Sequence, residues 1–357
     1  MKYLAVGFIA FIIAISVGYH FALYAEESET QASLSPSFFS ESSQVKDANP
    51  DTEASSGKSN RENETPDTGF RIVVNLASRG LALYENGIRT RLYPVAVGKE
   101  WTPTPTGHFI VEEKQEDPAW ASPRNEEFVL PPGEDNPLGT RWMGIGGYYG
   151  IHGTNAPWAI GDYISNGCIR MYDEDAQELF SIVPTGTPVE IIYQRIVADR
   201  QADGTINLYC YPDGYEWQDV GKKDALEALQ PYGVLDFVNS EAIAAHIEAS
   251  EGTPLFIAKS FPVWSEGINL GFFAVQANGD IYLPAVPLFA AFQTKWEWNA
   301  EKQEIVAKHR TVPGVQQGSG IYLTADQLEN ALRLNGNVND AGQFEVTDWK
   351  KKVEVRK

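Results

Sequence analysis

The sequence is poor in cysteine, in histidine and in positive charge, and each shortage argues against a class of function. Its 357 residues include two cysteines and five histidines. No histidine lies at metal-ligand spacing from another histidine, a cysteine or a carboxylate, so we expect no metal ion and no other cofactor. The formal charge of −20 argues against nucleic acid and against anionic lipid as partners.

The two cysteines stand in different settings. Cys210 lies in the strand-like run INLYCY (206–211), where a small buried hydrophobic side chain is expected. Cys168 follows Gly167 in a polar, glycine-containing segment. A disulfide between the two is possible in an oxidising compartment. We expect none, because the chemistry inferred below requires a free thiol at Cys168.

The N-terminus has the pattern of an export signal. Lys2 is followed by an apolar run from Leu4 to Val17, which continues with little interruption to Ala25. A run of about 20 residues is long enough to span a bilayer. No clear cleavage site follows it, so we favour an uncleaved membrane anchor at residues 1–25, with a cleaved signal peptide as the alternative. Both interpretations place the rest of the chain in the cell envelope, outside the cytoplasmic membrane.

A polar spacer separates this segment from the first folded domain. Residues 26–68 are rich in Ser, Glu, Asp, Asn, Thr and Pro and have little to bury, which predicts a disordered linker. Strand-like runs and an Asn-Gly turn at 86–87 then predict a mainly β domain over residues 69–195. Helical spacing of apolar residues predicts one helix from Asp173 to Ile182.

The C-terminal part contains an internal repeat. Residues 196–260 have mixed strand and helix patterns and are interpreted as a connecting α/β segment. Within residues 261–357, IYLPAVPL (281–288) matches IYLTADQL (321–328) at a period of about 40 residues. Each copy predicts a strand, a short helix and a pair of strands. Two copies are expected to form one small α+β module.

Cys168 and His152 are the residues most suited to chemistry. A thiolate can attack a carbonyl while an imidazole moves the protons, which is how covalent acyl transfer proceeds. A neighbouring imidazolium is expected to lower the pKa of the Cys168 thiol. Gly167 allows unusual backbone dihedrals next to the nucleophile, and the Gly153 carbonyl can orient the imidazole.

Four motifs in the β domain have the spacing of a known family. They are GKEWTPTPTG (98–107), NPLGTRWM (136–143), IHGTNAPWAIG (151–161) and ISNGCIRM (164–171). Together they closely resemble the signature of the YkuD-type L,D-transpeptidase family, over residues 70 to about 193.

The resemblance implies a β-sandwich with a short helix and an enzyme that acts on peptidoglycan. Members cleave the bond before the terminal D-alanine of a tetrapeptide stem, keep the stem as a cysteine thioester, and pass it to an amine of a neighbouring stem. By motif position, Cys168 is the nucleophile, His152 is the base and the Gly153 carbonyl orients it. The N–H groups of Gly167 and Cys168 would form the oxyanion hole. The implied roles are in cell wall biogenesis and cell shape, with carbapenem-type compounds as expected inhibitors.

The resemblance also implies residues that contact substrate. Arg170 would meet a substrate carboxylate, for which a guanidinium is suited. Ser165 and Thr154 would shape the pocket. Asn166 stands where many members have histidine, which leaves its contact with substrate open.

The repeated tail resembles the copper amine oxidase N-terminal-like module, an accessory domain from which we infer no copper. Its aromatic side chains have two interpretations, a glycan-binding surface or the core of a small β-rich unit. They are Trp264, Phe272, Phe273, Trp296 and Trp298.

Three functions are compatible with the sequence. The first is an L,D-transpeptidase, and the second is an L,D-carboxypeptidase of the same fold in which water captures the thioester. The third is a non-catalytic cell-wall-binding protein in which the tail is the functional part. The third residue of the stem peptide, the oligomeric state and the ligand of the tail stay open.

Overall fold

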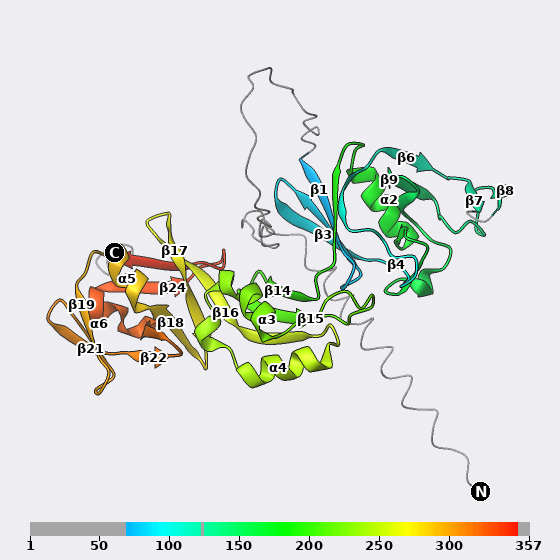
Figure 1. Cartoon of the computed structure of the whole chain (residues 1–357). Coiled ribbons are helices and arrows are strands. Elements are labelled where there is room, and N and C mark those ends of the chain that lie inside the picture. The colour runs from blue at the N-terminus through cyan, green and yellow to red at the C-terminus, as the bar shows by residue number, and fades with distance from the viewer. Residues whose placement is uncertain (1–68, 123–124, 349–357) are drawn as a thin grey trace, which may run out of the picture.

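A computed structural model of the chain describes residues 69–122 and 125–348 (Figure 1). These residues form an N-terminal lobe, residues 69–193, and a C-terminal lobe, residues 196–348. The predicted anchor and spacer, residues 1–68, lie outside the described residues. Within the two described ranges, no helix is both long enough and apolar enough to cross a membrane.

The first sheet of the N-terminal lobe has five strands in the order β3-β2-β1-β13-β5. The predicted hairpin is present, and Asn86 and Gly87 both have the positive φ that its tight turn requires, 51° and 82°. β1 runs parallel to β13, so the end of the lobe returns beside its beginning. The strands are β1 (Phe70–Asn75), β2 (Gly80–Glu85), β3 (Ile88–Pro94), β5 (Gly107–Ile110) and β13 (Pro188–Ile192).

The second sheet has four strands in the order β12-β10-β9-β6. They are β6 (Glu113–Glu116), β9 (Arg141–Gly146), β10 (Tyr149–His152) and β12 (Ile169–Arg170). Two smaller pairs and two helices complete the lobe: β4 (Val97–Gly98) with β11 (Tyr163–Ser165), β7 (Trp120–Ser122) with β8 (Asn125–Leu130), η1 (Pro157–Ala159) and α2 (Asp173–Ile182). Helix α2 begins and ends at the predicted residues.

The two sheets and α2 enclose one hydrophobic core. Ile72 of the first sheet, Met143 and Ile151 of the second and Leu179 of α2 belong to the same cluster of buried side chains. Burial of such a cluster is the main stabilising contribution to a domain of this size. The predicted fold class, a mainly β sandwich with a short helix, is confirmed.

The C-terminal lobe is built on a nine-stranded sheet whose main path is β14-β15-β16-β17-β18-β23-β22. We placed a boundary between residues 260 and 261, but β16 (Pro254–Ser265) crosses it, so the connecting segment and the repeat module share one sheet. The other strands of the path are β14 (Ile196–Arg200), β15 (Thr205–Cys210), β17 (Ile268–Ala277), β18 (Asp280–Pro284), β22 (Val315–Gln317) and β23 (Gly320–Thr324). The helices before β16 are α3 (Lys222–Leu229), η2 (Gln230–Tyr232), η3 (Leu235–Phe237) and α4 (Ser240–Ala249).

The internal repeat has the predicted elements in each copy. The first copy is β18, α5 (Ala285–Ala291), β19 (Trp296–Asn299) and β20 (Glu304–Ala307), followed by β21 (Arg310–Pro313). The second is β23, η4 (Ala325–Gln327), α6 (Leu328–Leu332), β24 (Leu334–Val338) and β25 (Phe344–Asp348). β18 pairs with β23 in antiparallel register through the equivalent residues Leu283 and Leu323, so the two copies are related by a local two-fold arrangement.

The aromatic side chains of the tail contribute to its core. Phe272 is buried within the core cluster of this lobe, and Trp296 and Trp298 pack against it. Of the two interpretations, the core role holds for these three residues. The resemblance of the tail to the copper amine oxidase N-terminal-like module stays a prediction.

Candidate active site

Pairing of β10 with β12 brings the two predicted reactive residues to neighbouring positions. His152 is the last residue of β10, and Cys168 immediately precedes β12. The strands run parallel, with Ile151 opposite Ile169 and His152 opposite Arg170. A separation of sixteen positions in sequence therefore becomes a short separation across one edge of the second sheet.

The imidazole of His152 is held in one orientation. The side chain is 3% exposed, and its Nδ1 lies 2.6 Å from the carbonyl oxygen of Gly153. Because a carbonyl only accepts hydrogen bonds, Nδ1 carries the proton, which leaves the lone pair of the neutral ring on Nε2. The ring stacks on Trp142, with 5.6 Å between centroids and 27° between planes. The structure thus places the Gly153 carbonyl where the sequence predicted the orienting group.

The Asp173 carboxylate packs against the backbone at Gly153, next to His152, and the sequence interpretation did not predict this contact. The sequence marks Asp173 only as the start of a helix, but its carboxylate accepts hydrogen bonds from Thr140 N at 2.7 Å and Thr140 Oγ1 at 2.8 Å. A Cβ atom on Gly139 or Gly153 would collide with the same carboxylate. Gly139 and Gly153 belong to two of the four family motifs. A glycine in a motif can mark a place where another group packs closely against the backbone, and here that group is the Asp173 carboxylate.

Gly167 has the unusual backbone that the sequence predicted. Its φ of 114° lies where side chains are disfavoured, and a Cβ atom there would collide with the ring of Tyr149. The N–H of Gly167, however, donates to Ser165 Oγ at 3.0 Å. It is therefore not free to receive an oxyanion, and we correct that part of the predicted oxyanion hole.

Ser165 fastens the nucleophile loop, residues 165–168. Its side chain is 1% exposed and its hydroxyl donates to the Cys168 carbonyl oxygen at 2.5 Å while accepting from Gly167. We expected Ser165 to shape the substrate pocket. The correction is that its hydroxyl is fully used inside the loop, because a buried polar group requires internal partners.

The Cys168 thiol is free, partly exposed and protonated. Its Sγ donates a weak hydrogen bond to the carbonyl oxygen of Tyr148 at 3.6 Å. Burial raises the pKa of the thiol, and the Gly150 N–H and the charge of Arg170 only partly oppose this. Cys210 is the second free thiol; it is buried, as predicted, and lies against Ser250.

The imidazole of His152 is neutral as well. Burial lowers its pKa to about 4, and the positive charge of Arg170 acts in the same direction. The carbonyls of Gly153 and Leu138 act in the opposite direction but are outweighed. The expectation that an imidazolium lowers the thiol pKa is therefore wrong for the resting protein, because desolvation disfavours the charged form of both groups.

Three predicted substrate-contacting residues remain, namely Arg170, Thr154 and Asn166. Arg170 is half-buried beside the thiol, and its Nε is buried without a hydrogen-bond partner among the described residues. Thr154 is buried and accepts from Ala156 N at 3.1 Å, within its own turn. Asn166 is exposed, and its Oδ1 accepts from Lys99 Nζ at 2.8 Å. Of the three, Arg170 is the one whose buried side-chain donor has no partner among the described residues.

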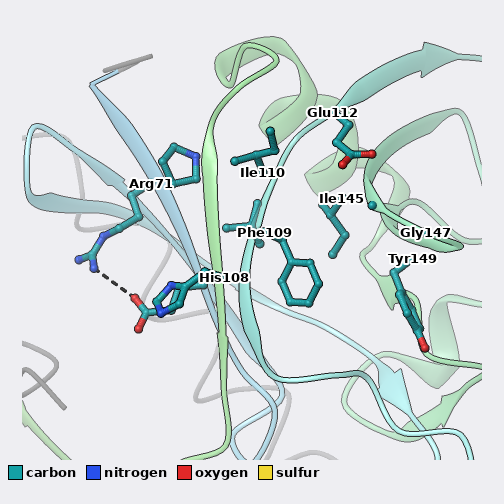
Figure 2. Close-up of a pocket in the computed structure, with 12 residues that line it drawn as sticks. Arg71, His108, Phe109, Ile110, Glu112, Ile145, Gly147 and Tyr149 are labelled. Atoms are coloured by element: carbon teal, nitrogen blue, oxygen red, sulfur yellow. Dashed lines mark hydrogen bonds and ion pairs between the residues drawn. The ribbon is translucent and has the colours of Figure 1, made fainter. Parts of the chain in front are cut away.

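A cavity of about 870 Å³ is lined by residues of both sheets of the N-terminal lobe, and neither Cys168 nor His152 is among them. Figure 2 shows the lining residues on both sides of one strand, with Arg71 and His108 on one side and Phe109, Ile145 and Tyr149 on the other. Tyr149 is also the residue whose ring a Cβ atom on Gly167 would meet, so this side chain lines the cavity and lies close to the nucleophile loop.

No group of three or more His, Cys, Asp or Glu side chains that could hold a metal ion occurs within residues 69–122 and 125–348. The expected absence of a metal stays a prediction.

Residues 69–191 match the YkuD family, the L,D-transpeptidase catalytic domain. The chain is 43% identical over 128 residues to the putative L,D-transpeptidase YkuD of Bacillus licheniformis, covering 35% of the chain and 68% of that protein. It is 40% identical over 136 residues to the putative L,D-transpeptidase YqjB of Bacillus subtilis, covering 36% and 74%.

A solved structure of the catalytic domain of E. faecium L,D-transpeptidase is 29% identical, with a TM-score of 0.30, and the match covers 36% of the chain and 99% of that structure. The chain spans only 65% of YkuD from Bacillus subtilis and 49% of ErfK/SrfK from Salmonella typhimurium. Through residues 69–191, the chain belongs to the YkuD-type L,D-transpeptidase family.

Proposed function

We propose that the protein is an L,D-transpeptidase that cross-links peptidoglycan through a thioester on Cys168. The observation that carries the proposal is the fixed imidazole of His152, oriented by the Gly153 carbonyl on the strand beside the nucleophile. Because Nδ1 holds the proton, Nε2 is the atom that can accept the proton of the thiol. This is the arrangement that a cysteine acyltransferase requires.

Because the Cys168 thiol and the His152 imidazole are both neutral at rest, we propose that the thiol loses its proton as it attacks the substrate. The thiol leaves the Tyr148 carbonyl, and Sγ attacks the carbonyl carbon before the terminal D-alanine as its proton passes to His152 Nε2. The resulting imidazolium returns that proton to the nitrogen of the leaving D-alanine, and the C–N bond breaks to give the thioester. The amine of a second stem then attacks the thioester, His152 takes up the amine proton, and the proton returns to the departing sulfur of Cys168.

The backbone N–H of Cys168 is the proposed donor to the oxyanion, since the Gly167 N–H is held by Ser165. Arg170 is the proposed partner of a substrate carboxylate. Its unpaired Nε lies beside the thiol, and a guanidinium binds a carboxylate through two parallel hydrogen bonds. Carbapenems, which carry a carboxylate next to a reactive carbonyl, are proposed to acylate the same sulfur.

The proposed location is the cell envelope. Support comes from the sequence of residues 1–25, interpreted as a membrane anchor, and from the substrate, which lies outside the cytoplasmic membrane. The proposed contribution is to wall biogenesis and cell shape, with the C-terminal lobe as an accessory part of the protein.

The purified protein should be incubated with a disaccharide-tetrapeptide, and the products analysed by mass spectrometry. We expect cross-linked dimers and free D-alanine from the wild type, and neither product from Cys168→Ala. Cys210→Ala is the matched control, since it removes the other thiol and should leave the products unchanged. Tripeptides without dimers would indicate an L,D-carboxypeptidase, and dimers formed by Cys168→Ala would contradict the proposed nucleophile.

A further inference from the structure

Tyr215 lies outside the matched family domain but belongs to the core of the N-terminal lobe. The family match ends at residue 191, and Tyr215 follows β15, a strand of the C-terminal lobe. Its side chain is nevertheless 4% exposed and is part of the buried cluster between the two catalytic sheets. The chain that leaves β15 therefore returns to the N-terminal lobe near β4 before α3 begins (Figure 1).

The Tyr215 hydroxyl holds the loop of residues 98–104. It donates to the carbonyl oxygen of Gly98 at 2.6 Å, and the N–H of Gly98 donates to Thr104 Oγ1 at 2.9 Å. Thr104 is fully buried. Burial raises the pKa of Tyr215 to about 12, so its hydroxyl remains a donor at neutral pH. Tyr215 is thus tied directly to Gly98 and, through the Gly98 N–H, to Thr104 at the other end of the loop.

The same loop holds the nucleophile loop. The carbonyl oxygen of Ser165 accepts from Lys99 N at 3.1 Å and from Thr102 Oγ1 at 3.1 Å. Gly98 and Ser165 are also paired residues of β4 and β11. Ser165 Oγ in turn binds the Cys168 carbonyl. Hydrogen bonds joined by short stretches of backbone therefore connect Tyr215 to the backbone of the nucleophile.

The turn that carries Tyr215 is itself rigid. Asp213 accepts hydrogen bonds from the Tyr193 hydroxyl at 2.5 Å and from two backbone N–H groups of the turn, and it pairs with Arg195. The Tyr163 ring packs edge-on against Tyr215, with 4.9 Å between centroids, and leaves no room for a Cβ atom on Gly214. Tyr163 belongs to β11, the strand that leads into the nucleophile loop.

We propose that Tyr215 is a positioning residue for Cys168, by which the C-terminal lobe fixes the nucleophile loop. The residue touches neither thiol nor imidazole and acts through the 98–104 loop. The expected effect of Tyr215 on the acylation of Cys168 rests on the proposed function, whereas its expected effect on the stability of the nucleophile loop does not. The matched family domain alone, without the Asp213–Gln218 turn, is on this proposal an incomplete catalytic unit.

Amide hydrogen exchange of residues 163–170 tests the structural part. Tyr215→Phe keeps the ring and removes the donor, and we expect exchange in this segment to become about tenfold faster, the effect of one lost buried hydrogen bond. Tyr232→Phe is the matched control, because its buried hydroxyl also donates to a backbone carbonyl, that of Ala198, within the C-terminal lobe. Unchanged exchange in Tyr215→Phe, or equal acceleration in both variants, would overturn the proposal.

Acylation of Cys168 by a carbapenem tests the catalytic part in the full chain. We expect Tyr215→Phe to lower the maximal acylation rate about tenfold with little change in the half-saturating concentration, since alignment and not binding is lost. A purely structural role would lower the amount of active protein and leave the rate of the remaining fraction unchanged, which would overturn the proposal. If wild-type protein is not acylated at all, the proposed function fails and hydrogen exchange still decides the role of Tyr215.

Thr102→Val provides a second route in case Tyr215→Phe does not fold. From a partly exposed position, it removes one of the two hydrogen bonds to the Ser165 carbonyl and leaves the one from Lys99 N. We expect the same pattern of faster exchange and slower acylation, and wild-type behaviour in this variant would overturn the proposed path.

Discussion

Acidification should remove a defined amount of stability through His152. The ordinary pKa of histidine, 6.5, falls to about 4 in the folded protein, because the ring is buried and faces Arg170. The folded state therefore favours the neutral ring, and the unfolded chain takes up the proton first. Stability from this group is fully present above pH 6.5 and is lost as the pH falls towards 4. The difference between the two pKa values corresponds to about 3 kcal/mol.

The measurement is the free energy of unfolding in urea between pH 7.5 and pH 4, for wild type and for His152→Gln. Glutamine can still donate to the Gly153 carbonyl but does not titrate. Other groups also contribute, among them Asp175, whose pKa burial raises to about 6. The difference between the two proteins removes these shared contributions. We expect wild type to lose about 3 kcal/mol more than His152→Gln over this range.

The pKa of His152 also determines the pH at which the acylation rate falls on the acid side of its pH profile. A neutral imidazole is the form that accepts a proton, so acylation of Cys168 by a carbapenem should fall to half near pH 4 and show no limb near pH 6.5. The inferred neutral state of His152 would be refuted if the stability difference between wild type and His152→Gln did not change with pH. Half-maximal acylation between pH 6 and 7 would also refute it. Thiolate absorbance of Cys168 at neutral pH would refute it equally.

Two further substitutions test the support of the site. Ser165→Ala leaves the Gly167 N–H without its acceptor and the Cys168 carbonyl without its donor, so we expect a loss of about 1–3 kcal/mol in urea unfolding and slower acylation. Equal stability of variant and wild type would contradict the inferred role of the hydroxyl. Gly153→Ala places a methyl group against the Asp173 carboxylate and should lower both melting temperature and acylation, whereas Gly221→Ala, whose added Cβ atom lies 4.0 Å from the nearest atom, should leave acylation unchanged.

The sequence predicted correctly those parts of the site that are determined by residues close to one another along the chain. Gly167 was assigned an unusual dihedral, and the Gly153 carbonyl was assigned to the imidazole beside it; both are present. Helix α2 likewise follows from the spacing of its own apolar residues. In each case the determining groups lie within a few positions of one another, so the pattern is visible in a short stretch of sequence.

The features that the sequence did not predict, or predicted wrongly, depend on groups that are distant in sequence or on burial. Asp173 binds Thr140, thirty-three positions away, and Tyr215 binds Gly98, 117 positions away. The boundary at residue 260 failed because strand pairing across β16 is not encoded in composition. The charge states failed because they are set by desolvation, which no residue pattern reports.

The neutral pair has a consequence for a thiol in an oxidising compartment. Oxidation of cysteine proceeds through the thiolate, so a raised pKa slows it as well as slowing unwanted alkylation. Cys210 is buried in the other lobe and leaves Cys168 without a partner for an intramolecular disulfide. If the export prediction for residues 1–25 holds, a permanently ionised nucleophile would be exposed to oxidants between turnovers. A thiol that loses its proton only as it attacks a bound carbonyl avoids this exposure, at the cost of depending on His152 and on the alignment of the nucleophile loop in each reaction.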